Sequence, residues 1–267
     1  WYAISNSFRT SAATTPVNSD TNGDYTIKDS SGNTVMTGVI AVIMAPGQPL
    51  SGQSRTTANF YNIANYLELN NATTSDAVQT MDNEVSSSTF NDRVEVLTRD
   101  NFMSEVAKYV TSYARSVMKL YYSTNGFLPN AAAYGGSACN TSVYQGRLPL
   151  SGLSGTSTGH CTGPALVWPT WFANNNWDTL IFYAVAPNCT IKNNATCAAS
   201  GGLTVTNLSS NARGVVIGTG RAWTGQSRPC TTASHCLEDA ENTNGDTTFV
   251  RPTRSDSNND YLMVISP

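Results

Sequence analysis

Six cysteines are the residues of this chain whose number and spacing most clearly indicate chemistry. They are Cys139, Cys161, Cys189, Cys197, Cys230 and Cys236. No Cys-x-x-Cys spacing occurs, and with only 2 histidines the sequence shows no zinc-ligand pattern. An even cysteine count then predicts disulfides, and we expect each cysteine to pair with its neighbour along the chain because this closes short loops. Buried free thiols are the alternative. Disulfides indicate a location outside the reducing cytoplasm.

A second group with ligand character is the run "SDTNGDYT" at 19–26, where Asp20, Asn22 and Asp24 alternate like the start of a calcium loop. The twelfth position of such a loop, which calls for Glu, is Ser31. Calcium is the one cofactor that the sequence raises, and a plain hairpin turn is the alternative interpretation.

The glycines of "GVVIGTGRAWTGQSR" at 214–228 resemble a phosphate loop. A phosphate loop requires a helix to follow, usually after Lys-Ser/Thr. Here "RPCTTASHC" follows, without a helical pattern. We therefore expect these glycines to serve strand packing and turns.

The sequence offers no complete set of catalytic groups. His160 and His235 each precede a cysteine, and "SGLSGTS" at 151–157 lacks the second glycine of a nucleophile elbow. We expect loop histidines and a protein that is not an enzyme.

Three tryptophans, Trp168, Trp171 and Trp177, precede a strand-like run. Exposed, they would contact a partner or stack on a glycan. Buried, they would close a packed junction, as the proline-flanked "VWPTWF" favours.

Composition narrows the class of protein. Of the 267 residues only 12% are charged, and the net charge is −3. Few charges among many small polar residues are typical of exported β-rich proteins, and the acidic balance argues against nucleic acid as the main partner.

Two parts of the chain repeat one another in the same order. "AVIMAPGQPLSGQSR" at 41–55 aligns with 214–228, and "YAIS" at 2–5 aligns with "YAVA" at 183–186. Further on, "YLE" matches "CLE", and "NDRVEVLT" matches "NDYLMVIS". Collinear matches of this kind predict duplicated β units over residues 1–100 and 177–267.

The elements between and within the repeats follow from periodicity. Each repeat contains β-branched or aromatic runs separated by turn residues, which predicts antiparallel strands. Between them, "NFMSEVAKYVTSYARSVMKLYYS" at 101–123 has apolar residues at steps of three and four, which predicts a helix capped by Asp100 or Asn101.

These elements predict an α+β fold with two units, residues 1–100 and 101–267. The second unit would comprise the helix 101–125, a disulfide-containing loop 126–176 and the sheet 177–267. The first would comprise a sheet alone, with one apolar face lacking a visible cover. Either the central helix serves both sheets, or the first sheet has a helix upstream of residue 1.

A helix, an irregular loop and an antiparallel sheet in this order resemble type IV pilins and the pseudopilins of type II secretion. "LYYSTNGFLP" at 120–129 is similar to the exit from the long pilin helix, and "WFANNNWDTLIFYAVA" at 171–186 to the entry into the sheet. "GVIAVIMAPGQPLSGQSR" at 38–55, followed by "NYLE" and "NDRVEVLTRD", is similar to large prepilin-type proteins.

The resemblance implies a non-enzymatic subunit, a minor pilin or pseudopilin ectodomain of a pilus or secretion filament. It also implies other pilin-like subunits as partners and a periplasmic or cell-surface location. In that family a hydrophobic N-terminal helix anchors the precursor in the inner membrane, and the sequence shows no such helix. The alternative is a secreted adhesin or carbohydrate-binding β module.

Overall fold

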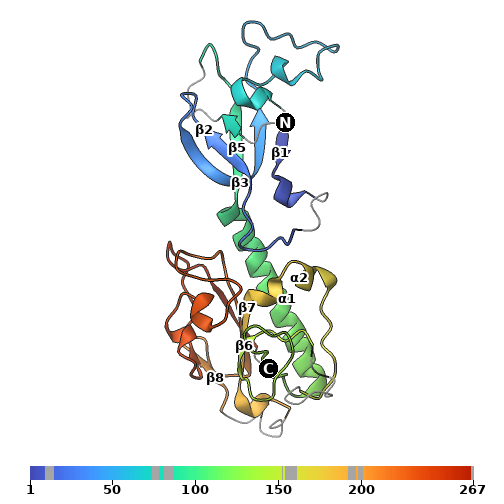
Figure 1. Cartoon of the computed structure of the whole chain (residues 1–267), viewed down its shortest axis with the longest axis vertical. Coiled ribbons are helices and arrows are strands. Elements are labelled where there is room, and N and C mark those ends of the chain that lie inside the picture. The colour runs from blue at the N-terminus through green and yellow to red at the C-terminus, as the bar shows by residue number, and fades with distance from the viewer. Residues whose placement is uncertain are drawn as a thin grey trace. The chain divides into compact units, whose positions relative to one another are not determined.

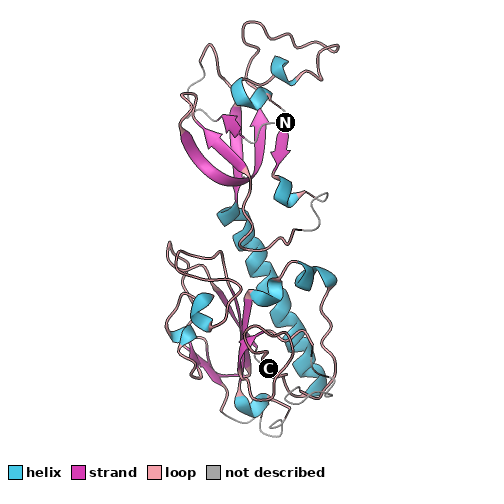
Figure 2. Ribbon diagram, viewed as in Figure 1, coloured by secondary structure: helices cyan, strands magenta, loops and turns pink. Residues whose placement is uncertain are grey.

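The structure is a computed structural model that describes all residues except 10–14, 74–77, 81–86, 152, 154–160, 192–196, 198–200 and 266–267. The chain divides into two compact units. The first comprises Trp1–Val17 and Thr21–Phe102, and the second comprises Asn18–Asp20 and Met103–Pro267. Both contain antiparallel sheet and a long helix is present, which confirms the predicted α+β class (Figure 1, Figure 2).

The sheet of the first unit is organised around one long strand. Its strands are β1 (Tyr2–Ile4), β2 (Tyr25–Lys28), β3 (Thr34–Ala45), β4 (Val78–Thr80) and β5 (Arg93–Thr98). Antiparallel pairing joins β3 to β1, β2 and β5, and β4 lies parallel to β2. One face of β3 is buried through Val42 and Met44, which pack with Leu67 from the segment that follows. The core of this unit therefore lies on one side of its sheet.

The second unit contains a long helix, a main sheet and a small sheet. Its elements are α1 (Arg99–Asn125) from Met103 onward, β6 (Gln145–Arg147), α2 (Thr170–Asn174), β7 (Ile181–Val185), β8 (Leu203–Val205), β9 (Ser209–Ala212), β10 (Gly214–Gly218), β11 (Thr248–Phe249) and β12 (Tyr261–Ile265). The main sheet has the strand order β12-β10-β7-β6, and the small sheet has the order β11-β8-β9. The residues of β7 and β10 are all buried, as expected for strands covered on both faces.

The helix α1 begins two residues before the predicted start. The main-chain N–H of Asn101 donates to Oγ1 of Thr98 at 3.3 Å, so Thr98 supplies the cap that we had assigned to Asp100 or Asn101. The helix ends at Asn125, and Gly126 follows at a φ of 76°. Among the helices that the structure describes, α1 included, none combines the length and apolarity that crossing a membrane requires.

Small residues let α1 pack closely on the main sheet. A Cβ at Gly218 of β10 would overlap the side chain of Thr111, and Nε of Arg115 donates to the Val264 carbonyl of β12 at 2.7 Å. Ala107 and Ala114 are also buried on this side of the helix. Figure 1 shows α1 running beside β7. The second unit is therefore a helix packed on an antiparallel sheet.

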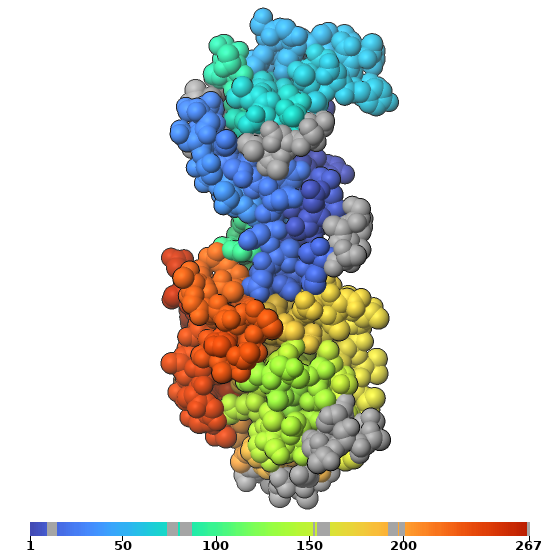
Figure 3. All heavy atoms as spheres, in the orientation of Figure 1, coloured from blue at the N-terminus to red at the C-terminus, as the bar shows by residue number. Residues whose placement is uncertain are grey.

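Disulfides join neighbouring cysteines in the sequential order. The bonds are Cys139–Cys161, Cys189–Cys197 and Cys230–Cys236. In the space-filling view the loop that follows α1, coloured yellow-green, lies beside the orange and red C-terminal segments (Figure 3). Because the disulfides fasten loops that contain little regular structure, they reduce the conformational freedom of those loops in the unfolded chain.

The two units repeat one another in strand pairing as well as in sequence. In the first, β3 lies between β1 and β5, and in the second, β10 lies between β7 and β12, all antiparallel. The parallel pair β2 and β4 of the first unit has a counterpart in β8 and β11 of the second. The long β3 corresponds to β9 and β10 together. The aligned sequence segments thus occupy equivalent places in the two units.

Candidate assembly surface

Equivalent cross-strand pairs define the same sheet face in each unit. Tyr2 of β1 lies opposite Ile43 of β3, and in the second unit Tyr183 of β7 lies opposite Val216 of β10. Residues directly opposite one another in an antiparallel pair project to the same face. The sequence repeat aligns Tyr2 with Tyr183 and Ile43 with Val216, so the two faces correspond.

In the second unit this face is the one that α1 covers. Val216 and Gly218 alternate along β10 and so share a face, and Gly218 touches Thr111 of α1. The hydroxyl of Tyr183 donates to the Pro129 carbonyl at 2.9 Å, in the segment directly after the helix. Tyr183 and Val216 are each 0% exposed. Helix and adjoining loop together bury this face.

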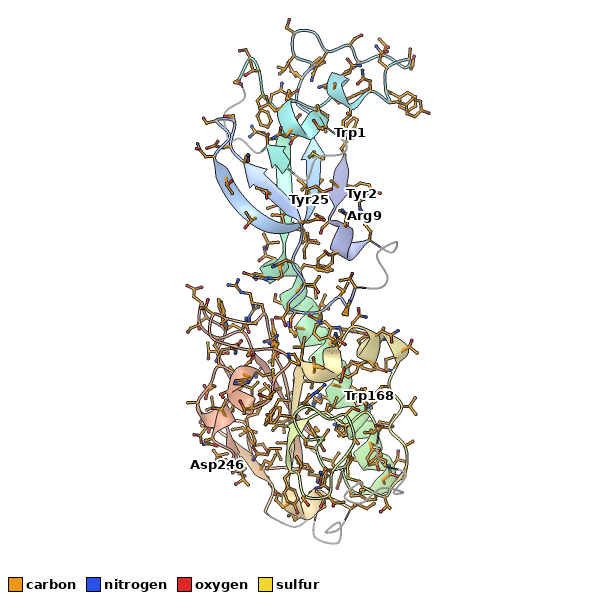
Figure 4. The ribbon with its side chains drawn as sticks, in the orientation of Figure 1. Trp1, Tyr2, Arg9, Tyr25, Trp168 and Asp246 are labelled. Carbon is orange, nitrogen blue, oxygen red and sulfur yellow. A yellow bond between two sulfur atoms is a disulfide. The ribbon has the colours of Figure 1, made fainter. Side chains whose placement is uncertain are left out.

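In the first unit the corresponding side chains are exposed. Tyr2 is 75% exposed and Ile43 is 63% exposed. Leu97 of β5 pairs with Ala41 on the same face and is 38% exposed, whereas its counterpart Ile265 is 0% exposed. Tyr2 is labelled on β1 in Figure 4. The charged residues Glu95 and Arg93 of β5 lie opposite Ile43 and Ala45, share this face and are exposed. We call the face formed by Tyr2, Ala41, Ile43, Ala45 and Leu97, with Arg93 and Glu95 beside them, the open face.

The open face differs from the covered face at one position, and this difference limits the size of the helix residue that can pack there. Ala45 stands where the second unit has Gly218. The Cβ of an alanine at position 218 would collide with Thr111. A helix packed on the open face in the manner of α1 therefore needs a residue smaller than threonine, or a wider separation, at the point opposite Ala45.

Behind the open face, a polar network fixes the loop that covers the other side of the sheet. In the first unit Nε2 of Gln53 donates to Oε1 of Glu68 at 2.8 Å, and the Leu50 N–H donates to Oε1 of Gln53 at 3.0 Å. The Asn91 N–H donates to Oε2 of Glu68 at 3.0 Å, and the Glu68 N–H to Oδ2 of Asp92 at 2.9 Å.

The second unit contains the same four hydrogen bonds. Nε2 of Gln226 donates to Oε1 of Glu238 at 3.0 Å, and the Trp223 N–H donates to Oε1 of Gln226 at 2.9 Å. The Asn259 N–H donates to Oε2 of Glu238 at 3.1 Å, and the Glu238 N–H to Oδ2 of Asp260 at 3.1 Å. The repeated Gly-Gln, Leu-Glu and Asn-Asp words of the sequence are therefore the members of one structural network.

The aspartates of this network have raised pKa values. Burial raises the pKa of Asp92 to about 6, against hydrogen bonds from the Glu68 N–H and Asn71 that lower it, and the neighbouring Glu68 carboxylate adds to the rise. Burial also holds the pKa of Asp260 well above its ordinary value, and Glu238 contributes to the shift. A buried carboxyl beside a carboxylate favours its neutral form, so each aspartate takes up a proton at a higher pH than an exposed aspartate does.

The predicted calcium ligands each have a partner of their own. Asp20 belongs to the second unit, where both carboxylate oxygens accept from Nη1 of Arg228 at 2.9 Å. In the first unit Oδ1 of Asn22 accepts from Arg99, and Oδ2 of Asp24 accepts from the Asn6 N–H at 3.1 Å. The described residues hold no cluster of three or more His, Cys, Asp or Glu side chains fit for a metal ion.

The tryptophans lie at the junction before β7. Trp177 is 2% exposed and its indole is enclosed in the core, so of its two predicted arrangements the structure shows the buried one. Trp168 is half-buried, donates from Nε1 to the Pro149 carbonyl at 3.1 Å and stacks on Phe172. Trp171 is half-buried against Tyr113 of α1. Packing accounts for these contacts.

The other candidates are structural or lie outside the described residues. The glycines 214–220 form β10 and its exit, where a Cβ at Gly220 would overlap Asn259. His235 belongs to a short 3-10 turn and its Nδ1 lies 3.0 Å from the Thr231 hydroxyl. His160 lies outside the described residues.

Comparison of the chain with protein-family models, with curated proteins and with solved structures finds no match. The architecture and its internal repeat are therefore the observations from which function is argued.

Sequence reasoning anticipated an uncovered sheet face but not its residues. Tyr2, Ile43 and Leu97 lie in strands too short or too uniformly apolar for alternation to show which face is open. Pairing the repeats residue by residue provides the signal, since Tyr183 and Val216 mark the covered face.

Proposed function

We propose that this chain is a structural subunit of a pilin-like filament, a minor pilin or pseudopilin ectodomain, with no catalytic role. The observation that supports the proposal is the open face. The second unit packs a helix on its sheet, and the first unit repeats that sheet while leaving the helix-side residues Tyr2, Ile43 and Leu97 exposed.

The open face supports assembly through a helix. Exposed apolar side chains gathered on one sheet face are typical of a surface that a partner covers. Burying Tyr2 and Ile43 would stabilise a complex by about 1.5–3 kcal/mol for each side chain fully covered. The pilin resemblance implies a helix N-terminal to this sheet, and such a helix would place the first unit in the same arrangement as the second.

The disulfides fit a location on the cell surface or in the periplasm. All six cysteines form disulfides, and bonds of this kind persist in oxidising compartments. The proposed partners are accordingly other pilin-like subunits, and the proposed anchor before assembly is the inner membrane.

Filament fractionation tests the proposal. The cells that make this protein are sheared, and the released filaments and the envelope are probed with an antibody against the second unit. We expect the protein in the filament fraction or in a complex with pilin-like subunits at the filament base. We expect Ile43→Asp to reduce that share several-fold, whereas Tyr61→Asp, on an exposed loop residue, leaves it unchanged. Absence from both fractions would overturn the proposal.

A further inference from the structure

A groove follows the outer edge of β12 in the second unit. Two adjoining hollows of about 250 Å³ and 440 Å³ share Arg251, Leu262 and Met263 in their walls. On one side the walls come from α1 through Glu105, Lys108 and Arg115. We call this feature the β12 groove.

The edge of β12 presents main-chain groups to this groove. The Ala186 N–H donates to the Arg213 carbonyl, and hydrogen bonding along β10 then alternates between its two neighbouring strands. Gly214, Val216 and Gly218 therefore bond to β12, and the residues between them bond to β7. The N–H and C=O groups of Leu262 and Val264 consequently point away from β10. The bond from Arg115 to the Val264 carbonyl agrees with this orientation.

These outward groups are largely unpaired within the described part of the chain. Arg115 occupies the Val264 carbonyl, while the N–H of Val264 and both main-chain groups of Leu262 have no hydrogen-bond partner among the described residues. Since β12 ends the strand order of its sheet, it is an edge strand. Edge strands with free groups accept a further strand from a partner.

The charge of the groove is positive although the whole protein is acidic. Its four basic residues, Lys108, Arg115, Arg251 and Arg254, outnumber its two acidic ones, Glu105 and Asp260. None of the three arginines forms an ion pair with a carboxylate of the described residues; Arg254 instead lies over the Tyr261 ring at 5.4 Å. Lys108 and Glu105 form an exposed pair at 3.4 Å, which screening makes weak. The groove therefore has basic charge that this chain leaves unmatched.

We propose that the β12 groove binds an extended, acidic peptide segment of another protein, which adds to the sheet as a strand beside β12. Main-chain bonds to Leu262 and Val264 supply its orientation. The arginines supply the preference for acidic side chains, and Leu208 and Met263 accept apolar side chains between them. The open strand edge and the apolar wall favour a peptide over a nucleic acid, because a nucleic acid has no strand main chain with which to extend the sheet.

Binding of a designed peptide tests this inference. The probe is the fluorescently labelled peptide Thr-Glu-Val-Glu-Val-Glu-Thr, and its anisotropy is measured against the whole chain at low and at physiological salt. We expect saturable binding that weakens as salt rises. A version of the peptide with lysines in place of the glutamates, and a version with proline in place of both valines, should bind at least about tenfold more weakly. Each proline removes an N–H that a strand needs.

Two charge-reversal variants locate the site. Arg251→Glu should weaken binding of the acidic peptide by about tenfold or more, because Arg251 borders both hollows. Arg93→Glu, an exposed arginine of β5 in the first unit, is the matched control and should leave binding unchanged. On binding, amide exchange at Leu262 and Val264 should slow.

Three results would overturn the proposal. They are no saturable binding, equal weakening by Arg251→Glu and Arg93→Glu, or binding that the proline peptide reproduces. Tighter binding of a single-stranded oligonucleotide than of the acidic peptide would also contradict it and would identify the groove as a nucleic-acid site. None of these results depends on incorporation into a filament, so the inference and the proposed function fail separately.

Discussion

The main-chain N–H of Glu68 donates to Oδ2 of Asp92 at 2.9 Å, joining the loop that covers the first sheet to the start of β5. Both oxygens of Glu68 and Oδ2 of Asp92 accept N–H groups, while Oδ1 of Asp92 is buried without a partner. Burial of this unpartnered oxygen disfavours the charged carboxylate, in agreement with the raised pKa of Asp92. Oδ1 of Asp260 is buried and unpartnered in the same way.

The first prediction concerns the pH dependence of stability. The folded-state pKa of Asp92 is raised from 3.8 to about 6, so the folded first unit binds more protons than the unfolded chain between these values. The free energy of unfolding contributed by this group therefore falls as the pH rises from about 4 to about 6 and stays lower above that.

Asp92→Asn tests this account, because the amide keeps the acceptor for the Glu68 N–H and replaces the proton with an N–H donor. We expect the variant to lose the fall between pH 4 and 6 and to be more stable than the wild type at pH 8, on the order of 1 kcal/mol. Urea unfolding at pH 4.5, 6 and 8 measures both effects. Lower stability of the variant at pH 8 would count against a raised pKa of Asp92.

The second prediction concerns the contact between α1 and β10. Gly218→Ala inserts a Cβ into the Thr111 side chain and should destabilise the second unit by roughly 1–3 kcal/mol. Thr111→Ala in the same chain should restore part of the loss, because it removes the nearest atom. Gly136→Ala is the control, since its Cβ would meet only the Ala133 carbonyl oxygen at 3.5 Å. Equal Tm values for Gly218→Ala and Gly136→Ala would refute the close packing.

The repeated network explains why so much of the fold could be predicted from the sequence. Gln53 and Gln226, each in a Gly-Gln-Ser-Arg word, make the same bonds in the two units, so matching words marked matching positions. The helix α1 was predictable because its apolar stripe covers several turns. Strands β4, β6 and β11 were not predictable, since each is short and pairs with a strand distant in sequence, and β9 was not because it is short and mostly polar.

The residues of the two candidate surfaces, the open face and the β12 groove, could not be predicted from the sequence for a related reason. Nothing in the sequence distinguishes Arg251 and Arg254 from other surface residues. Only the fold places them along β12 together with Arg115 of α1. Tyr2 and Tyr183 are aligned in sequence, yet only the structure shows that one is exposed and the other enclosed. Exposure depends on which element covers a face, and pattern alone does not report it.

The third prediction concerns an asparagine in each unit whose side chain bonds to both the N–H and the C=O of one other residue, a pair of bonds that we call the bracket. Nδ2 of Asn242 donates to the Val250 carbonyl at 2.9 Å and its Oδ1 accepts from the Val250 N–H at 2.8 Å. Asn71 makes the same pair of bonds to Thr80 at 2.9 and 2.7 Å.

Asn242→Ala should therefore cost roughly 1–3 kcal/mol, because it leaves the part-buried N–H and C=O groups of Val250 without their partner. Thermal unfolding of this variant is compared with that of Asn244→Ala, whose side chain is exposed. A Tm for Asn242→Ala as high as that of the control would show that the bracket is dispensable.

The fourth prediction uses the distribution of the disulfides. All of the cysteines, and hence all three disulfides, lie in the second unit. Reduction should lower the Tm of the second unit while the unfolding of the first unit stays in place. Calorimetry with and without a reductant separates the two, and an equal shift of both transitions would contradict independent folding of the units.

The central claim is that the open face of the first unit accepts a helix as the sheet of the second unit accepts α1. The direct measurement is fluorescence anisotropy of a labelled peptide with the sequence of residues 101–123 and the substitution Thr111→Ala, titrated with the whole chain. We expect saturable binding that Ile43→Asp abolishes and that Tyr61→Asp, at a still more exposed residue outside the sheet, leaves unchanged. No saturable binding, or the same affinity for Ile43→Asp as for the wild type, would contradict it.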